Sequence, residues 1–284
     1  MKPGTVALTF HFVARNFSLY LPQKTDMDCG ICLISVAPLR ALPDDRSEQV
    51  TQMLFGDLFT VLEKKEKWLL VQLVADSYQG WVSSGQVTPL APDEMDLLLK
   101  QSQWVSNDLV QLLENKSRNH SFLVSAGSSF YDCSDQAFEL AGEQWYFHGA
   151  MSPVKDFDQA SVINHAMLFL HAPYQWGGKS VLGIDCSGFT QLVYKMAGKS
   201  IHRDASQQAR QGEMINLIHE ARPGDLLFFD DEEGNIIHTG IMLDESYIIH
   251  AHQKVRIDKI DHHGIFNVDT RKYTHQLRII KSFR

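Results

Sequence analysis

The sequence predicts an α+β protein in which an all-β N-terminal part precedes a domain that combines helices and strands. Three observations support this fold class. The chain has 284 residues, enough for roughly two domains. Between about residues 30 and 150, short apolar runs alternate with turn residues, a pattern typical of small β-structures. After Ser152-Pro153 the pattern changes to two helix-length segments followed by strands.

The composition excludes several classes of protein. Hydrophobic residues form 44% of the chain, so a disordered or fibrous protein is excluded. The formal net charge is −8 and no basic tract stands out, which argues against a nucleic-acid partner. Polar residues interrupt every apolar run before it reaches the roughly 18 residues of a transmembrane helix. We therefore expect a soluble protein with no membrane partner.

Residues 1–29 are assigned to an N-terminal extension. Residues 5–22 faintly resemble the apolar region of a signal peptide, but His11, Arg15 and Asn16 interrupt it and no small-residue cleavage site follows. We expect a cytoplasmic protein, with export to the periplasm as the alternative. The sequence leaves open whether residues 1–26 are ordered and whether they belong to the mature protein.

The chain has four cysteines, at positions 29, 32, 133 and 186. They are too few and too scattered for a disulfide scaffold, which favours a reducing compartment. Cys29 and Cys32 have C-x-x-C spacing, but no second pair completes a zinc site, so we interpret them as small residues near the first strand. No metal or nucleotide motif is visible, and no cofactor is expected.

Short strands dominate residues 30–92, which we assign to a first small β-domain. The clearest strands are 58–62, 68–74 and 80–83. Apolar residues then recur at helical spacing, so residues 94–113 are expected to form a helix within a linker at 93–117. A second β-region at 118–152 is indicated by short apolar runs at 121–124, 139–140 and 145–148.

Residues 153–284 are expected to form the α+β domain. An amphipathic helix covers 157–170 and stops before Pro173, and a second helix covers 186–197 with Gly198 as its C-terminal stop. Strands are expected at 225–229, 236–243, 247–251, 254–260 and 276–281.

Cys186 follows a glycine-rich loop and opens the second of these helices. The partial positive charge of a helix N-terminus favours a thiolate, so the pKa of Cys186 is expected to fall below that of a free cysteine. The alternative is an inert, buried cysteine. A nucleophilic cysteine needs a base on another element, oriented by a third group. His238 and His250 fit this need, because each lies six residues from Asp244 and a simple hairpin would make them direct cross-strand neighbours.

Several short motifs of this domain occur together in one order. They are Tyr174-Gln175-Trp176-Gly177-Gly178, Asp185-Cys186-Ser187-Gly188-Phe189, residues 222–229 (RPGDLLFF), His238-Thr239-Gly240-Ile241 and Ile249-His250-Ala251. Over about residues 155–281 they resemble the NlpC/p60 family of papain-like cysteine peptidases. Residues 30–92 resemble a bacterial SH3 domain through segments 36–40, 54–57 and 80–82, and residues 118–152 resemble one loosely. The resemblance implies a papain-like catalytic domain preceded by two SH3-like barrels.

The resemblance also implies a reaction. The family cleaves peptides of bacterial peptidoglycan, with Cys186 as the nucleophile, His238 as the base and His250 as the orienting residue. The whole chain is similar to γ-D-glutamyl-L-diamino acid endopeptidases that recycle murein peptides and release L-Ala-γ-D-Glu as dipeptidyl peptidases. In these enzymes an acidic residue after the catalytic helix and a tyrosine of the first SH3 domain sense the free N-terminal amine.

Asp204 and Tyr78 occupy the corresponding positions here, and Ser187 is expected to complete the amine site. Trp176 is expected to support the cleft. The simpler alternatives are that Asp204 only caps the helix after it and that Tyr78 only packs in its barrel.

Other functions remain open at this point. One is a secreted endopeptidase that cuts the intact wall, another is a non-catalytic protein that binds wall peptides, and a third is acyl transfer by the same cysteine. A murein peptide substrate is the expected partner. The sequence does not identify the diamino acid, the organism or the oligomeric state.

Overall fold

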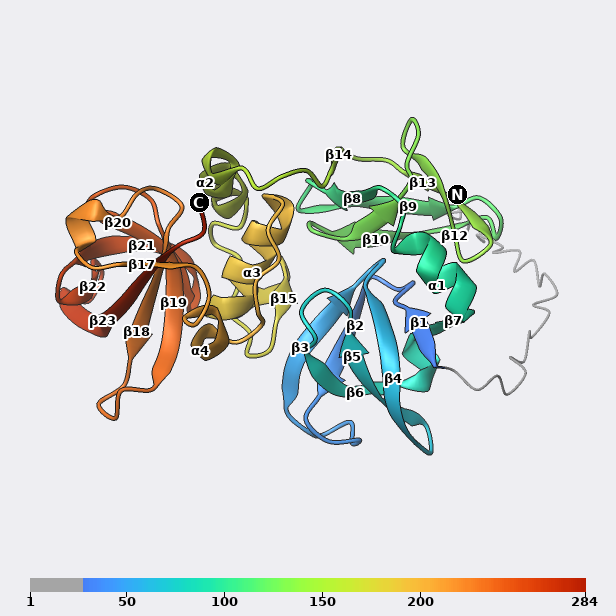
Figure 1. The fold of residues 1–284 in the computed structure, drawn as a ribbon, viewed down its shortest axis with the longest axis horizontal. Helices are drawn as coiled ribbons and strands as arrows, with labels where there is room; N and C mark the ends of the chain where they lie inside the picture. The colour runs from blue at the N-terminus through green and yellow to red at the C-terminus, as the bar shows by residue number, and fades with distance from the viewer. Residues whose placement is uncertain (1–27) are drawn as a thin grey trace, which may run out of the picture.

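The computed structural model describes residues 28–284, and the predictions for residues 1–26 lie outside them. Two β-units and an α+β domain meet around helix α3 (Cys186–Met196) (Figure 1). The predicted extension to residue 29 is one residue too long, since Cys29 already belongs to the first strand. In residues 28–284, no helix is both long enough and apolar enough to span a lipid bilayer.

The first unit is a seven-stranded antiparallel sheet with the order β3-β2-β6-β5-β4-β1-β7. Its strands are β1 (Cys29–Ile31), β2 (Val36–Arg40), β3 (Gln49–Leu54), β4 (Leu58–Lys65), β5 (Trp68–Leu73), β6 (Gln79–Ser83) and β7 (Thr88–Leu90), with the short helix η1 (Ser84–Gln86) before β7. The three predicted strands are confirmed as β4, β5 and β6. Alternation along β5 places Leu69, Val71 and Leu73 in the core of this unit.

The helix predicted at 94–113 is wrong over its second half. Helix α1 (Pro92–Leu98) ends early, and residues 103–106 and 110–115 form strands β8 (Gln103–Ser106) and β9 (Val110–Asn115). Between these strands, Asn107 N–H donates to the Ala150 carbonyl and Asp108 Oδ2 accepts from the Ala150 N–H. Strand pairing with partners distant in sequence therefore outweighs the helical spacing of the apolar residues.

The second β-unit consequently starts at residue 103, inside the predicted linker. It comprises a four-stranded sheet, β10-β9-β13-β12, and a three-stranded sheet, β11-β8-β14. Its remaining strands are β10 (His120–Ser125), β11 (Ser129–Tyr131), β12 (Ala137–Leu140), β13 (Glu143–Phe147) and β14 (Met151–Pro153). Phe55 of the first unit packs among Phe130, Phe138 and Trp145 of the second, so the two units share one core. An SH3-like barrel in the second unit stays a prediction.

The α+β domain contains the predicted helices, as α2 (Gln159–Leu168) and α3, and one large sheet with the order β17-β23-β18-β19-β20-β21-β22. Because β22 also pairs with β23, strands β18 to β23 form a closed ring. The bounds are β15 (Lys179–Ser180), β16 (Gly183–Ile184), α4 (Ala205–Gln208), β17 (Glu213–Ile215), η2 (Ile218–Glu220), β18 (Leu226–Asp230), β19 (Ile236–Met242), β20 (Tyr247–His252), β21 (Lys254–Asp261), β22 (Gly264–Asn267) and β23 (Lys272–Ser282).

The apolar face of α3 anchors this domain. Phe189, Leu192 and Val193 are fully buried, in one core with Ile241 of β19 and Ile249 of β20. The five predicted strands are confirmed as β18, β19, β20, β21 and β23. The packing of α3 against β19 and β20 brings the N-terminus of the helix next to the strands that carry the predicted histidines.

Candidate active site

Cys186 is the first residue of α3 and is 7% exposed. Asp185 is the N-cap, and its carboxylate accepts hydrogen bonds from the backbone N–H of Gly188, at 2.7 Å, and of Gly177, at 2.8 Å. One carboxylate thus fixes both the start of the helix and the glycine-rich loop before it. Gly188 is required here, since a Cβ would lie 2.3 Å from the carbonyl oxygen of Gly178.

The expected fall in the pKa of Cys186 is not found. Burial raises the pKa of this thiol to about 12, and the adjacent Asp185 carboxylate adds to the rise. Backbone hydrogen bonds from Thr239 and Ser187 and the charge of Arg203 offset only part of it. Desolvation therefore outweighs the helix N-terminus. A reactive Cys186 must pass its proton to a nearby base at the moment of attack.

His238 on β19 and His250 on β20 are brought together as predicted, with His238 Nε2 2.8 Å from His250 Nδ1. The predicted register is wrong, however, because the strand pairing places Gly240, not His238, opposite His250. The connecting loop is centred one residue later, with the Leu243 N–H bonded to the Tyr247 carbonyl. Side chains two residues apart on a strand share a face, so the histidines meet diagonally.

Both rings are neutral at neutral pH. Burial lowers the pKa of His238 well below its ordinary value, and the neighbouring His250 lowers it further. Burial also lowers the pKa of His250, although the Asp258 carboxylate partly offsets this. A neutral imidazole can act as a proton acceptor.

Tyr78 and Asp204, predicted from opposite ends of the chain, meet at the boundary between the first β-unit and the α+β domain. The Tyr78 hydroxyl donates to Asp204 Oδ1 at 3.1 Å. Burial raises the pKa of Asp204, against the lowering effects of Arg203 and the Tyr78 hydrogen bond. Asp204 is also the N-cap residue of α4, so the simpler role proposed for it coexists with the contact to Tyr78.

Ser187 and Trp176 lie on the same cavity. The Ser187 hydroxyl is occupied, since it accepts a hydrogen bond from Arg203 at 2.8 Å and lies 3.4 Å from Asp185 Oδ1. Trp176 is 62% exposed, and its ring N–H donates to Glu48 of the first unit at 2.6 Å. Ser187 therefore lies deep in the site and Trp176 at its rim.

The cavity between the first β-unit and the α+β domain has a volume of about 520 Å³. Its lining includes Cys186, Ser187, Tyr78, Asp204, Trp176 and Glu48. All four residues predicted to bind substrate thus surround one space together with the predicted nucleophile. Its size lies within the roughly 300–1,000 Å³ range of small-molecule sites.

Sequence comparison assigns both parts of this cavity. Residues 171–274 match the NlpC/P60 family, and residues 39–87 match the bacterial dipeptidyl-peptidase SH3 domain. The chain carries an NlpC/P60 domain. This is the domain of a cysteine-type peptidase, and the first β-unit contains the SH3 domain.

Several curated proteins are similar to most of this chain. A γ-D-glutamyl-L-lysine dipeptidyl-peptidase of Bacillus cereus is 28% identical over 71% of this chain, which spans about two thirds (66%) of that relative. Dipeptidyl-peptidase 6 of Lysinibacillus sphaericus is 29% identical over 84% of this chain and 95% of its own length. The fold resembles the crystal structure of an NlpC/P60 family protein from Bacillus cereus, with a TM-score of 0.77, 21% identity and coverage of 90% and 99% of the two chains.

Two parts of the NlpC/P60 site have no counterpart in the sequence-based prediction. One is Arg203, which is 1% exposed and holds both oxygens of Asp185, at 3.0 and 2.6 Å, and the Thr51 hydroxyl of the SH3 domain, at 2.7 Å. The other is Asp258, which lies behind His250. A single arginine or aspartate without a motif gives no sequence signal, because its importance depends on partners that are distant along the chain.

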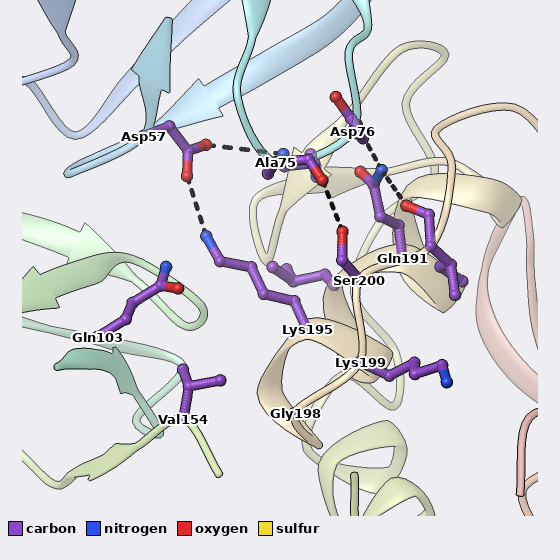
Figure 2. Close-up of a pocket in the computed structure, with 13 residues that line it drawn as sticks. Asp57, Ala75, Asp76, Gln103, Val154, Gln191, Lys195, Gly198, Lys199 and Ser200 are labelled. Atoms are coloured by element: carbon purple, nitrogen blue, oxygen red, sulfur yellow. Dashed lines mark hydrogen bonds and ion pairs between the residues drawn. The ribbon is translucent and has the colours of Figure 1, made fainter. Parts of the chain in front are cut away.

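A second cavity, of about 250 Å³, lies beside α3 where the NlpC/P60 domain meets both β-units (Figure 2). Lys195 of α3 donates to Asp57 of the SH3 domain at 2.9 Å, and Lys179 lies 3.6 Å from the same carboxylate. Gln191, on the same helix, donates to Asp76 at 2.7 Å (Figure 2). These contacts fix α3 to the SH3 domain at some distance from Cys186.

Proposed function

We propose that this chain hydrolyses the γ-D-glutamyl-L-diamino acid bond of murein peptides that carry a free N-terminal L-alanine. The products are L-Ala-γ-D-Glu and the remaining peptide, and the reaction belongs to cell-wall peptide recycling in the cytoplasm. The names of the relatives support this class of bond. The observation that carries the proposal is the Asp204 carboxylate, held by Tyr78 in the same cavity as Cys186.

Asp204 is suited to an ammonium group. Burial raises the pKa of Asp204 and the neighbouring Arg203 offsets part of this rise, but the Arg203 guanidinium is hydrogen-bonded to both oxygens of Asp185 and not to Asp204. Asp204 is half-buried, and Tyr78 supplies a hydrogen bond but no charge. A free N-terminal amine would complete a charge-assisted pair here. An acetylated terminus would leave the desolvated carboxylate without a cation, which weakens its binding.

The proposed chemistry uses the cysteine and the two histidines. His238 takes the proton of Cys186 as the sulfur attacks the carbonyl carbon of the γ-glutamyl amide. The Cys186 backbone N–H, at the first position of α3, has no partner within the helix and can donate to the oxyanion. The C–N bond then breaks as His238 protonates the leaving amine. Water cleaves the resulting thioester and restores the thiol.

The test compares L-Ala-γ-D-Glu-L-Lys, and its meso-diaminopimelate analogue, with the N-acetylated forms. Release of dipeptide is followed by mass spectrometry, with Cys186→Ala as the inactive control. Cleavage of the free-amine peptides alone supports the proposal. Equal cleavage of both forms would favour an enzyme that cuts intact wall, and no cleavage of either would favour a binding protein or a transferase.

A further inference from the structure

A hydrogen-bonded chain continues behind the two histidines into the closed β-ring. His250 Nε2 lies 3.1 Å from Asp258 Oδ2 of β21, and His250 Nδ1 faces His238 Nε2 at 2.8 Å. His250 and Asp258 are completely buried. Neither the catalytic reaction proposed above nor the substrate contacts require Asp258 directly.

Arg256 holds Asp258 in place. Its guanidinium donates to both carboxylate oxygens, at 2.6 and 2.9 Å, and the Val268 N–H donates to Oδ1 at 3.1 Å. Burial tends to raise the pKa of Asp258, but the hydrogen bonds from His250 and Arg256 lower it to about 2. Asp258 is therefore a carboxylate at neutral pH and can only accept hydrogen bonds.

The negative charge of Asp258 determines which ring nitrogen of His250 and of His238 carries the proton. Because Asp258 only accepts, His250 must carry its proton on Nε2, and its Nδ1 becomes an acceptor. His238 must then donate from Nε2, which leaves its Nδ1 without a proton. We propose that Asp258 is a positioning residue that sets the tautomers of both histidines so that Nδ1 of His238 is free to take the Cys186 proton. This inference rests on the proposed cysteine-peptidase function.

Among residues 28–284, the other titratable groups that face the two histidines include no second carboxylate beside Asp258. The groups that face the two histidines are His252 of the same strand as His250, His275 of β23, stacked on His238 with ring centroids 4.2 Å apart, and Arg256 of β21. Burial lowers the pKa of His252. Burial and the neighbouring His250 lower the pKa of His275 to about 4. In the part of the chain that the structure describes, Asp258 is thus the anion that contacts His250.

Asp258→Asn tests the inference with an almost isosteric side chain. The amide can donate to His250 Nε2, which would reverse every proton in the chain and place a proton on Nδ1 of His238. Alkylation of Cys186 by iodoacetamide, followed by mass spectrometry, is expected to slow at least ~100-fold at pH 7, the scale of a lost general base. The pH profile of the alkylation rate should shift to alkaline values in Asp258→Asn. Asp258→Glu, which keeps the charge, should recover part of the alkylation rate.

The matched control is Asp261→Asn, three residues along the same strand, whose carboxylate bonds the backbone of His263 and the Tyr273 hydroxyl. It should alkylate like the native protein. A folded Asp258→Asn variant with the native rate and pH profile would overturn the inference.

A second measurement does not depend on the folding of the variant. In the native protein, ¹⁵N NMR of the imidazoles should show Nε2–H tautomers for both His238 and His250, and an Nδ1–H tautomer of either would overturn the inference. Neither readout uses a murein peptide. Failure to cleave such a peptide would therefore count against the proposed substrate and not against Asp258.

Discussion

The hydroxyl of Tyr78 donates a hydrogen bond of 3.1 Å to the carboxylate of Asp204, across the boundary between the SH3 domain and the NlpC/P60 domain. The two residues are separated by 126 positions in the chain. One wall of the candidate substrate cavity is therefore assembled from both domains.

Tyr78→Phe removes this hydrogen bond and keeps the ring. A hydrogen bond to a charged group contributes about 1.5–3 kcal/mol, so KM for a free-amine murein tripeptide should rise about 10-fold or more, with little change in kcat. Steady-state kinetics measures both parameters. Tyr146→Phe is the control, because its hydroxyl bonds Gln136 in the second β-unit. An unchanged KM in Tyr78→Phe would separate this tyrosine from substrate binding.

Asp204→Asn should abolish the preference for a free N-terminus. The ratio of kcat/KM between the free and the acetylated tripeptide is expected to fall at least ~10-fold, since the amide cannot form a charge-assisted pair with an ammonium group. Asp231→Asn, in an exposed loop, is the matched control. If the ratio stays at its native value, the amine must be recognised elsewhere.

Arg203→Met leaves the buried Asp185 carboxylate without its cation. Loss of one partner of a buried ion pair lowers the free energy of unfolding by about 3–5 kcal/mol. Urea denaturation of this variant, beside Arg210→Met at an exposed position, measures the difference. A loss below about 1 kcal/mol would show that the pair contributes little to stability.

Gly188→Ala should disturb the start of α3, because the new methyl group would overlap the carbonyl oxygen of Gly178. The glycine-rich loop must then move away from Cys186, and peptidase activity is expected to fall by at least ~10-fold, as for other small displacements of reacting groups. Gly85→Ala, where a Cβ meets open space, should behave as the native protein. Equal activities of the two variants would contradict this packing argument.

Acid should destabilise the protein through the histidine cluster. The pKa of His275 is about 4 in the folded protein because of burial and of the neighbouring His250, against 6.5 in an unfolded chain. The unfolded chain therefore binds more protons between these values, and the free energy of unfolding falls as the pH drops through this range. His275→Gln should make this fall shallower in urea titrations at pH 7 and pH 5, while His219→Gln, at an exposed position, should not.

The sequence was a good guide to residues whose pattern is local. Helix α3, five of the six strands of the β-ring and the contact between His238 and His250 all followed from periodicity and short motifs, whereas β22 was not predicted. The strand register, offset by the loop after Leu243, was out of reach because loop geometry decides it. The predicted continuation of the helix past Leu98 was wrong because β8 pairs with β11 and β9 with β13, and such partners distant in sequence decide between helix and strand there.

In the candidate active site, too, the residues marked by a local motif could be predicted and those that depend on distant partners could not. Cys186 could be located from its motif. The direction in which its pKa shifts could not be predicted, since burial is a property of the packed protein. Arg203 and Asp258 act through residues on other elements, and nothing beside them in the chain marks them.

Lys195 lies on the helix that begins with Cys186, and its ammonium group is held by Asp57 of the SH3 domain (Figure 2). A hinge motion between these domains would separate Asp57 from Lys179 and Lys195. It would leave uncompensated charges in a poorly hydrated junction, at a cost of several kcal/mol. We therefore expect the opening of the substrate cavity beside Trp176 to keep a constant width. The proposed murein peptides would then enter a preformed opening, and their binding would need no closure of the two domains.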